Sequence, residues 1–198
     1  MKPVERIRAG LRDAADPSKA PAMQAYMKSA MPFLGVQKPS RTRLVRPIAR
    51  TLDDGQAVAA ASILWDEAMY REERYAALEL LRGRPVSGDL ARHLITTGAW
   101  WDYVDEVATK LLPADVDVQA WAVDEDMWIR RAAILSQVGR RSRTDPAMLA
   151  NVIEPNLDDR RFWITKAIGW ALRDYARTEP EWVRSFVSAH ALGPLSER

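Results

Sequence analysis

Apolar residues recur at spacings of three and four along almost the whole chain, which is the period of an α-helix. Ile7 and Leu11, for example, lie one turn apart. Short groups of Pro, Gly, Asp and Ser separate these segments, and no segment alternates with a period of two, so we predict an all-α fold without a sheet. Ser40 is expected to cap a helix that Pro47 bends or shortens. The other expected helices cover residues 4–14, 19–31, 56–67, 72–82, 89–96, 100–113, 116–123, 127–138, 145–153, 162–178 and 181–191.

The sequence contains an internal repeat. Residues 124–134 match residues 159–168 at a constant offset of 35, and residues 70–78 form a weaker copy. Each copy places an aromatic residue and a cation between acidic or polar residues and small apolar ones, a pattern that resembles the second helix of HEAT-like repeats. A single repeat cannot bury its own apolar face, so neighbouring repeats must stack. We therefore predict a curved solenoid of HEAT-like repeats that forms one domain over residues 1–198.

Composition narrows the possible classes of protein. Of the 198 residues 47% are hydrophobic, which is enough for a core. There is no cysteine, and His93 and His190 lie far apart, so we expect neither disulfides nor a metal site nor a cofactor. No apolar run approaches the roughly 18 residues of a membrane span, and the chain begins with a charged amphipathic segment. The expected location is the cytoplasm.

The basic residues are clustered. Of the 29 Lys and Arg residues 23 are arginine, the cation whose planar group best matches phosphate, although the net charge is only +2. This combination predicts a basic face, the concave groove of the solenoid, balanced by acidic residues elsewhere. The clusters are Arg41, Arg43, Arg46 and Arg50; Arg130, Arg131, Arg140, Arg141 and Arg143; and Arg160, Arg161, Lys166 and Arg173.

One stretch, residues 99–105, carries candidate chemistry. In a helix, Trp101 and Asp105 lie at i and i+4 on the same face. A carboxylate beside an indole is a poor choice for a core, because it must be paired or hydrated, but it is well suited to a cationic substrate. The alternative is that Trp100 and Trp101 are core residues and that Asp105 is a solvated helix residue.

Five blocks in the same order carry a resemblance to a known family. They are residues 26–28, 32–35, 100–105 (WWDYVD), 128–133 (WIRRAA) and 166–175 (KAIGWALRDY). Together they resemble the HEAT-like-repeat DNA alkylation-repair glycosylases of the AlkD type, over about residues 23–195. Relative to that family, residues 82–90 and 112–123 are compact, and the final helix is expected to be missing or shortened.

The resemblance implies an enzyme of base excision repair that hydrolyses the N-glycosidic bond of 3- and 7-alkylated purines in double-stranded DNA. It matches Trp101 and Asp105 to the family's catalytic Trp and Asp. It also matches Arg131 to the active-site Arg and Trp170 to a second Trp of the groove. Members of the family are thought to act without drawing the base into a pocket, unlike ordinary base-flipping enzymes.

The chemistry of these residue types fits that reaction. A purine alkylated on a ring nitrogen is cationic and departs without a general acid, so the remaining task is to stabilise an oxocarbenium-like sugar and position water, which Asp105 can do. Trp101 and Trp170 offer π-faces to the cationic nucleotide, and Arg131 can hold a phosphate by two hydrogen bonds. The expected contacts with the DNA backbone come from Tyr26, Lys166 and Arg173. The expected partner is therefore duplex DNA with alkylated purines, bound by a monomer.

Three other functions stay open at this stage. The substrate could be a bulky adduct of a DNA-alkylating natural product instead of a simple methylated base. The chain could be a DNA-binding module without catalysis, although an anion such as Asp105 has no use in a groove that only binds phosphates. It could also be a protein-binding scaffold, a common use of helical solenoids, against which the arginine-rich inner helices argue.

Overall fold

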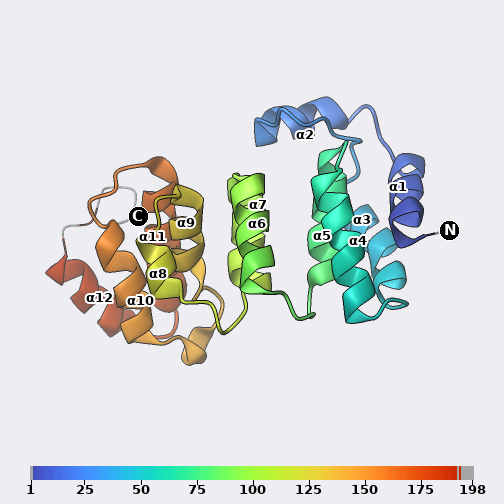
Figure 1. Ribbon diagram of the computed structural model, residues 1–198. Coiled ribbons are helices and arrows are strands. Elements are labelled where there is room, and N and C mark those ends of the chain that lie inside the picture. The colour runs from blue at the N-terminus through green and yellow to red at the C-terminus, as the bar shows by residue number, and fades with distance from the viewer. Residues whose placement is uncertain (1, 191, 193–198) are drawn as a thin grey trace. The chain divides into compact units, whose positions relative to one another are not determined.

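The computed structural model describes residues 2–190 and residue 192, and within them every regular element is a helix (Figure 1). The chain divides into two compact units, Met1–Val86 and Ser87–Arg198. The all-helical, repeat-built fold that the sequence predicts is confirmed. No helix in the described part of the chain is long and apolar enough to cross a membrane.

The first unit is built around α5. Its helices are α1 (Pro3–Asp13), α2 (Ala20–Met27), α3 (Lys38–Ala49), α4 (Asp54–Asp66) and α5 (Arg71–Leu81). The helix α5 packs against α1, α3 and α4, and it is buried on most of its surface. Leu64 and Trp65 of α4 and Leu80 of α5 are completely buried there. Burying such side chains contributes about 1.5–3 kcal/mol each.

A buried carboxylate holds the loop that precedes α3. Glu72, with no exposed surface, accepts hydrogen bonds from the backbone N–H groups of Leu34, Gly35 and Val36 at 2.9–3.0 Å. Gly35 has φ +86°, and a Cβ there would lie 2.0 Å from the carbonyl oxygen of Asp16. Only glycine fits that backbone position. Residues 32–35 are one of the sequence blocks behind the family resemblance, and the glycine in this block is required by the backbone conformation of the loop.

The second unit contains successive helical hairpins. Its helices are α6 (Gly88–Gly98), α7 (Trp101–Glu106), α8 (Val118–Ala122), α9 (Met127–Leu135), α10 (Pro146–Ile153), α11 (Phe162–Tyr175) and α12 (Pro180–Ala189), with a π-helical turn, Val107–Leu111, directly after α7. In one layer α9 packs between α7 and α11, and in a second layer α8 packs against α10. Hairpins that repeat in this way bring the second helix of each hairpin side by side.

All twelve predicted helices are present among the described residues, but several ends differ. The cap of α3 is Gln37 and not Ser40, since α3 already begins at Lys38, so the capping prediction is wrong. The second helix ends at Met27 because Lys28 adopts a left-handed conformation with φ 48°. Pro47 lies inside α3, two residues before its end. The predicted chain ending around residues 194–198 lies outside the described residues.

Candidate active site

The centre of the site is an ion pair between α7 and α9. Arg131 donates from Nε to Oδ1 of Asp105 at 2.8 Å and from Nη2 to Oδ2 at 2.9 Å. The side chains are 5% exposed for Arg131 and 14% for Asp105, so the carboxylate keeps some access to solvent. A two-point contact of this kind fixes both groups in a single orientation.

The remaining contacts of Arg131 are within the protein. Its Nη1 donates to the carbonyl oxygen of Trp163 at 2.5 Å, and its guanidinium carbon lies 5.7 Å from the Trp163 ring centre. The sequence interpretation gave Arg131 a phosphate contact. In the structure each of its three nitrogens donates one hydrogen bond, to Asp105 or Trp163, so Arg131 orients the carboxylate. A guanidinium has five N–H donors, and the phosphate contact stays a prediction.

Asp105 is electrostatically unusual. Burial raises the pKa of its carboxyl above the ordinary 3.8, the two hydrogen bonds and the charge of Arg131 oppose that rise, and the nearby charge of Asp102 adds to it. A carboxylate has about four lone-pair positions, and Arg131 uses two of them. The others are free to accept hydrogen bonds from water or to face positive charge. Perturbed carboxyl groups of this kind are frequent at functional sites.

Four indoles form a cluster that meets this pair at Trp163. Trp101 stacks on Trp163 with an interplanar angle of 21° and 6.4 Å between ring centres. Trp100 lies 5.5 Å from Trp163 and 6.2 Å from Trp128, and Trp128 lies 5.9 Å from Trp163. Trp101, Trp128 and Trp163 are all partly exposed. The cluster forms an aromatic wall beside Asp105.

Sequence reasoning missed Trp128 and Trp163 as site residues. A signal was present, because both occupy the same position in the two copies of the repeat at the offset of 35. Since the second helices of successive hairpins stack, equivalent positions come together, and these two rings are in contact.

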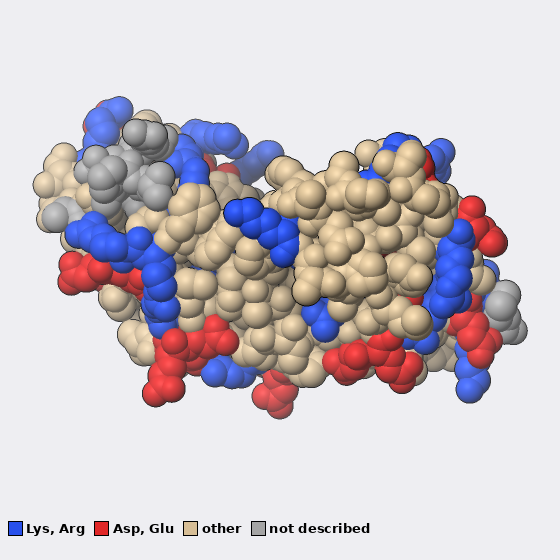
Figure 2. Space-filling view, turned by 90° about the horizontal axis from the view of Figure 1, so that it is seen from above, with Lys and Arg blue, Asp and Glu red and all other residues tan. Residues whose placement is uncertain are grey.

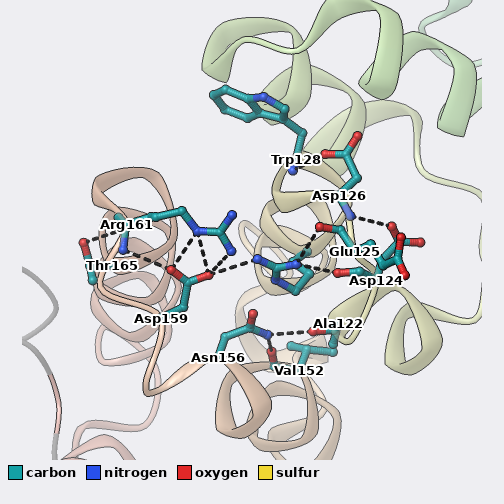
Figure 3. Close-up of polar contacts among 11 residues, drawn as sticks. Ala122, Asp124, Glu125, Asp126, Trp128, Val152, Asn156, Asp159, Arg161 and Thr165 are labelled. Carbon is teal, nitrogen blue, oxygen red and sulfur yellow. Dashed lines mark hydrogen bonds and ion pairs between the residues drawn. The ribbon is translucent and has the colours of Figure 1, made fainter.

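The starts of α9 and α11 are tied to one another by polar contacts (Figure 3). Asp126 accepts from the backbone N–H of Trp128 at 2.7 Å and so caps α9. Arg130 donates from Nη1 to the carbonyl oxygen of Asp124 and from Nη2 to Asp159 at 3.0 Å, directly before α11. This connection holds the helices that carry Arg131 and Trp163 in register.

A second hydrogen-bonded contact holds α8 to α10, behind these helices. The buried amide of Asn156 donates to the carbonyl oxygens of Ala122 at 2.8 Å and Val152 at 3.1 Å (Figure 3). The outer layer is thus fastened by hydrogen bonds as well as by apolar packing.

The predicted DNA-contact residues lie on two different units. Trp163, Lys166, Trp170 and Arg173 occupy one face of α11 at spacings of three and four, with Lys166 and Arg173 exposed and Trp170 partly exposed. Tyr26 lies on α2 of the first unit and is 76% exposed. Figure 2 shows Lys, Arg, Asp and Glu side chains exposed on the face that is seen from above. The roles of these residues stay predictions.

No group of three or more His, Asp and Glu side chains within residues 2–190 and 192 is arranged to hold a metal ion.

Comparison with known proteins identifies the family of the chain. The chain is similar to a solved structure titled "Predicted DNA alkylation repair enzyme from Enterococcus faecalis", with a TM-score of 0.81, 26% sequence identity and coverage of 93% of each chain. No curated protein gives a significant match. A family model described as DNA alkylation repair enzyme matches residues 7–198. The chain therefore belongs to the DNA alkylation repair enzyme family.

Proposed function

We propose that this protein is a monofunctional DNA glycosylase that releases N3- and N7-alkylated purines from duplex DNA. The observation that carries the proposal is the arrangement of Asp105. Its carboxylate is oriented by Arg131, keeps partial access to solvent and stands beside an aromatic wall. That arrangement suits a reaction in which positive charge develops on a sugar.

The substrate supplies its own leaving group. An alkylated ring nitrogen makes the purine cationic, so departure needs no proton donor. As the bond to the base breaks, the sugar becomes oxocarbenium-like, and the fixed negative charge of Asp105 stabilises it. The lone pairs not used by Arg131 can accept hydrogen bonds from a water molecule and direct it to the sugar carbon.

The aromatic wall supports the same reaction. Trp101 presents a partly exposed ring that Trp163 holds in place by stacking. A π-face attracts the cationic base or sugar, and this attraction strengthens where water is excluded. In this proposal Trp170, Lys166 and Arg173 extend the contact along α11 to the DNA backbone.

The decisive experiment measures release of 7-methylguanine from methylated duplex DNA by the wild type and by Asp105→Asn. Losing one preorganised electrostatic stabiliser costs roughly 10²–10³ in rate. The matched control is Asp115→Asn, the same substitution at an exposed position of the same unit, which should keep full activity. Equal activity in wild type and Asp105→Asn would contradict the assigned role.

Measurements of DNA binding and base release by the wild-type protein distinguish the other candidate functions. If it binds duplex DNA tightly and releases no methylated base, a panel of duplexes with bulky cationic N7 adducts should follow. Release of those adducts would narrow the substrate class, whereas no release from any duplex would leave a DNA-binding module.

A further inference from the structure

The Ser87–Arg198 unit contains a cavity that the proposed reaction does not use. It lies between the π-helical turn after α7 and the segment that follows α9, and it has a volume of about 610 Å³. Its charged lining side chains are Lys110, Arg140 and Arg143, and no acidic residue of the described chain lines it. Three exposed cations line this cavity without a carboxylate among them.

The three cations are not used elsewhere in the described structure. Within residues 2–190 and 192, the side chains of Lys110, Arg140 and Arg143 form no ion pair or hydrogen bond. A carboxylate does contact the backbone of the cavity: Asp174 accepts a hydrogen bond from the N–H of Gly139, another lining residue, at 2.6 Å. Unpaired cations around a concave surface favour an anionic ligand.

An independent observation points to a ligand with hydrogen-bond acceptors. Ser136 lines the same cavity and is 3% exposed, yet its Oγ has no hydrogen-bond partner. Buried polar groups in proteins are almost always paired, and an exception calls for an explanation. The oxygen itself is covered, and rotation about the Cα–Cβ bond would turn it into the cavity, where an anion would be its partner.

The cavity lies next in the chain to the candidate active site, and one lining residue is hydrogen-bonded to the backbone of Asp105. Thr109 lines the cavity, and its Oγ1 donates to the carbonyl oxygen of Asp105 at 2.7 Å. A ligand in the cavity would therefore lie about one helical turn from Asp105 along the same helix. A π-helical turn at such a place is itself frequent at functional sites.

We propose that this cavity binds a phosphate group, gripped by Lys110, Arg140, Arg143 and the Ser136 hydroxyl, and that in use it is a backbone phosphate of the DNA strand held at Asp105. Arginine and lysine with a hydroxyl donor match the charge and the several oxygens of a phosphate. The choice of DNA as the source of that phosphate rests on the proposed function. A free inorganic or nucleotide phosphate has the same chemistry and must be distinguished by experiment.

The first test measures affinity for undamaged duplex DNA, which requires no excision. Ser136→Ala removes only an oxygen and should weaken binding about 10-fold, the value of a hydrogen bond to a charged group. A variant with both Lys110→Ala and Arg143→Ala should bind more weakly still, and the slope of log affinity against log salt should fall by about 1.8. Ser188→Ala and Arg184→Ala on α12 are the matched controls, and both should bind like the wild type.

The second test identifies the source of the phosphate. A set of duplexes carries one neutral methylphosphonate at each successive position near a fixed lesion. One position should weaken wild-type binding clearly more than binding by the variant with Lys110→Ala and Arg143→Ala, because that variant has already lost two of the charges that contact the phosphate. In parallel, titration with inorganic phosphate reports binding without DNA.

The outcomes separate this inference from the proposed function. Loss of duplex affinity in the variants supports the phosphate site even if the wild type releases no base. Normal duplex binding by all cavity variants overturns it, even if the protein is an active glycosylase. Binding of inorganic phosphate that Ser136→Ala abolishes, with duplex affinity and the methylphosphonate pattern unchanged, would overturn the DNA assignment and indicate a free phosphate as ligand.

Discussion

Each unit of the molecule buries a carboxylate, and the two are used in different ways. Glu72 in the first unit is fully enclosed and satisfies three backbone N–H groups of one loop. Asp105 in the second unit is paired with a single side chain and keeps partial exposure. A carboxylate that is closed in by backbone donors holds the fold. One that retains open lone pairs next to a partly exposed aromatic wall is available for chemistry.

The largest expected effect comes from removing the negative charge of each of these two carboxylates in turn. Glu72→Gln keeps the shape of the side chain but turns an NH₂ towards backbone donors, so the free energy of unfolding should fall by about 3 kcal/mol. Urea unfolding measures this loss. Asp105→Asn, the same chemical change, should mainly reduce excision. The contrast would fail if Glu72→Gln abolished excision while leaving stability intact.

Arg131→Gln should reduce excision about 10–100-fold and shift its pH dependence. Activity requires the Asp105 anion, and burial raises its pKa, so wild-type excision should decline in acid already above pH 3.8. Arg131 opposes that rise in pKa, so its loss should move the acid limb to higher pH. Excision rates measured from about pH 4 to pH 9 at saturating DNA give the acid limb of the wild type and of the variant.

The same titration has a consequence for stability. Because native Asp105 holds its proton to higher pH than the unfolded chain does, its contribution to the free energy of unfolding falls as pH rises from about 3.8 through the native pKa. This pH dependence of the free energy of unfolding should be absent in Asp105→Asn.

For excision, an acid limb of Arg131→Gln that coincided with that of the wild type would mean that Arg131 does not act through Asp105.

The smallest expected effect concerns the aromatic wall. Trp163→Phe keeps an apolar ring but weakens the stack on Trp101, and aromatic pairs are worth about 0.5–1.5 kcal/mol. Excision should fall about 2–10-fold. Trp182→Phe is the control, since Trp182 stacks on Phe186 at an interplanar angle of 16° on α12. Equal losses in both variants would indicate a general effect on packing.

Helix positions were predictable from the sequence because the apolar spacing is local information. Helix ends were less so. Lys28 takes a left-handed conformation without being a glycine, and the turn after α7 is π-helical where a continuing α-helix was expected. At Lys28 the helix is closed by backbone hydrogen bonds from Lys28 to Ala25 and from Ser29 to Gln24. Apolar periodicity reports which face of a helix is buried and not such changes of backbone conformation.

The candidate active site was likewise predictable from the sequence only in part. The sequence by itself determined the all-helical class, the repeat offset of 35 and the shared face of Trp101 and Asp105, since each follows from spacing along one helix. Only the tertiary structure decided that Arg131 points its guanidinium at Asp105 and that Trp163 supports Trp101. The physical reason is that these contacts join three different helices. Their partners are chosen by how the hairpins stack, which no spacing within a single helix specifies.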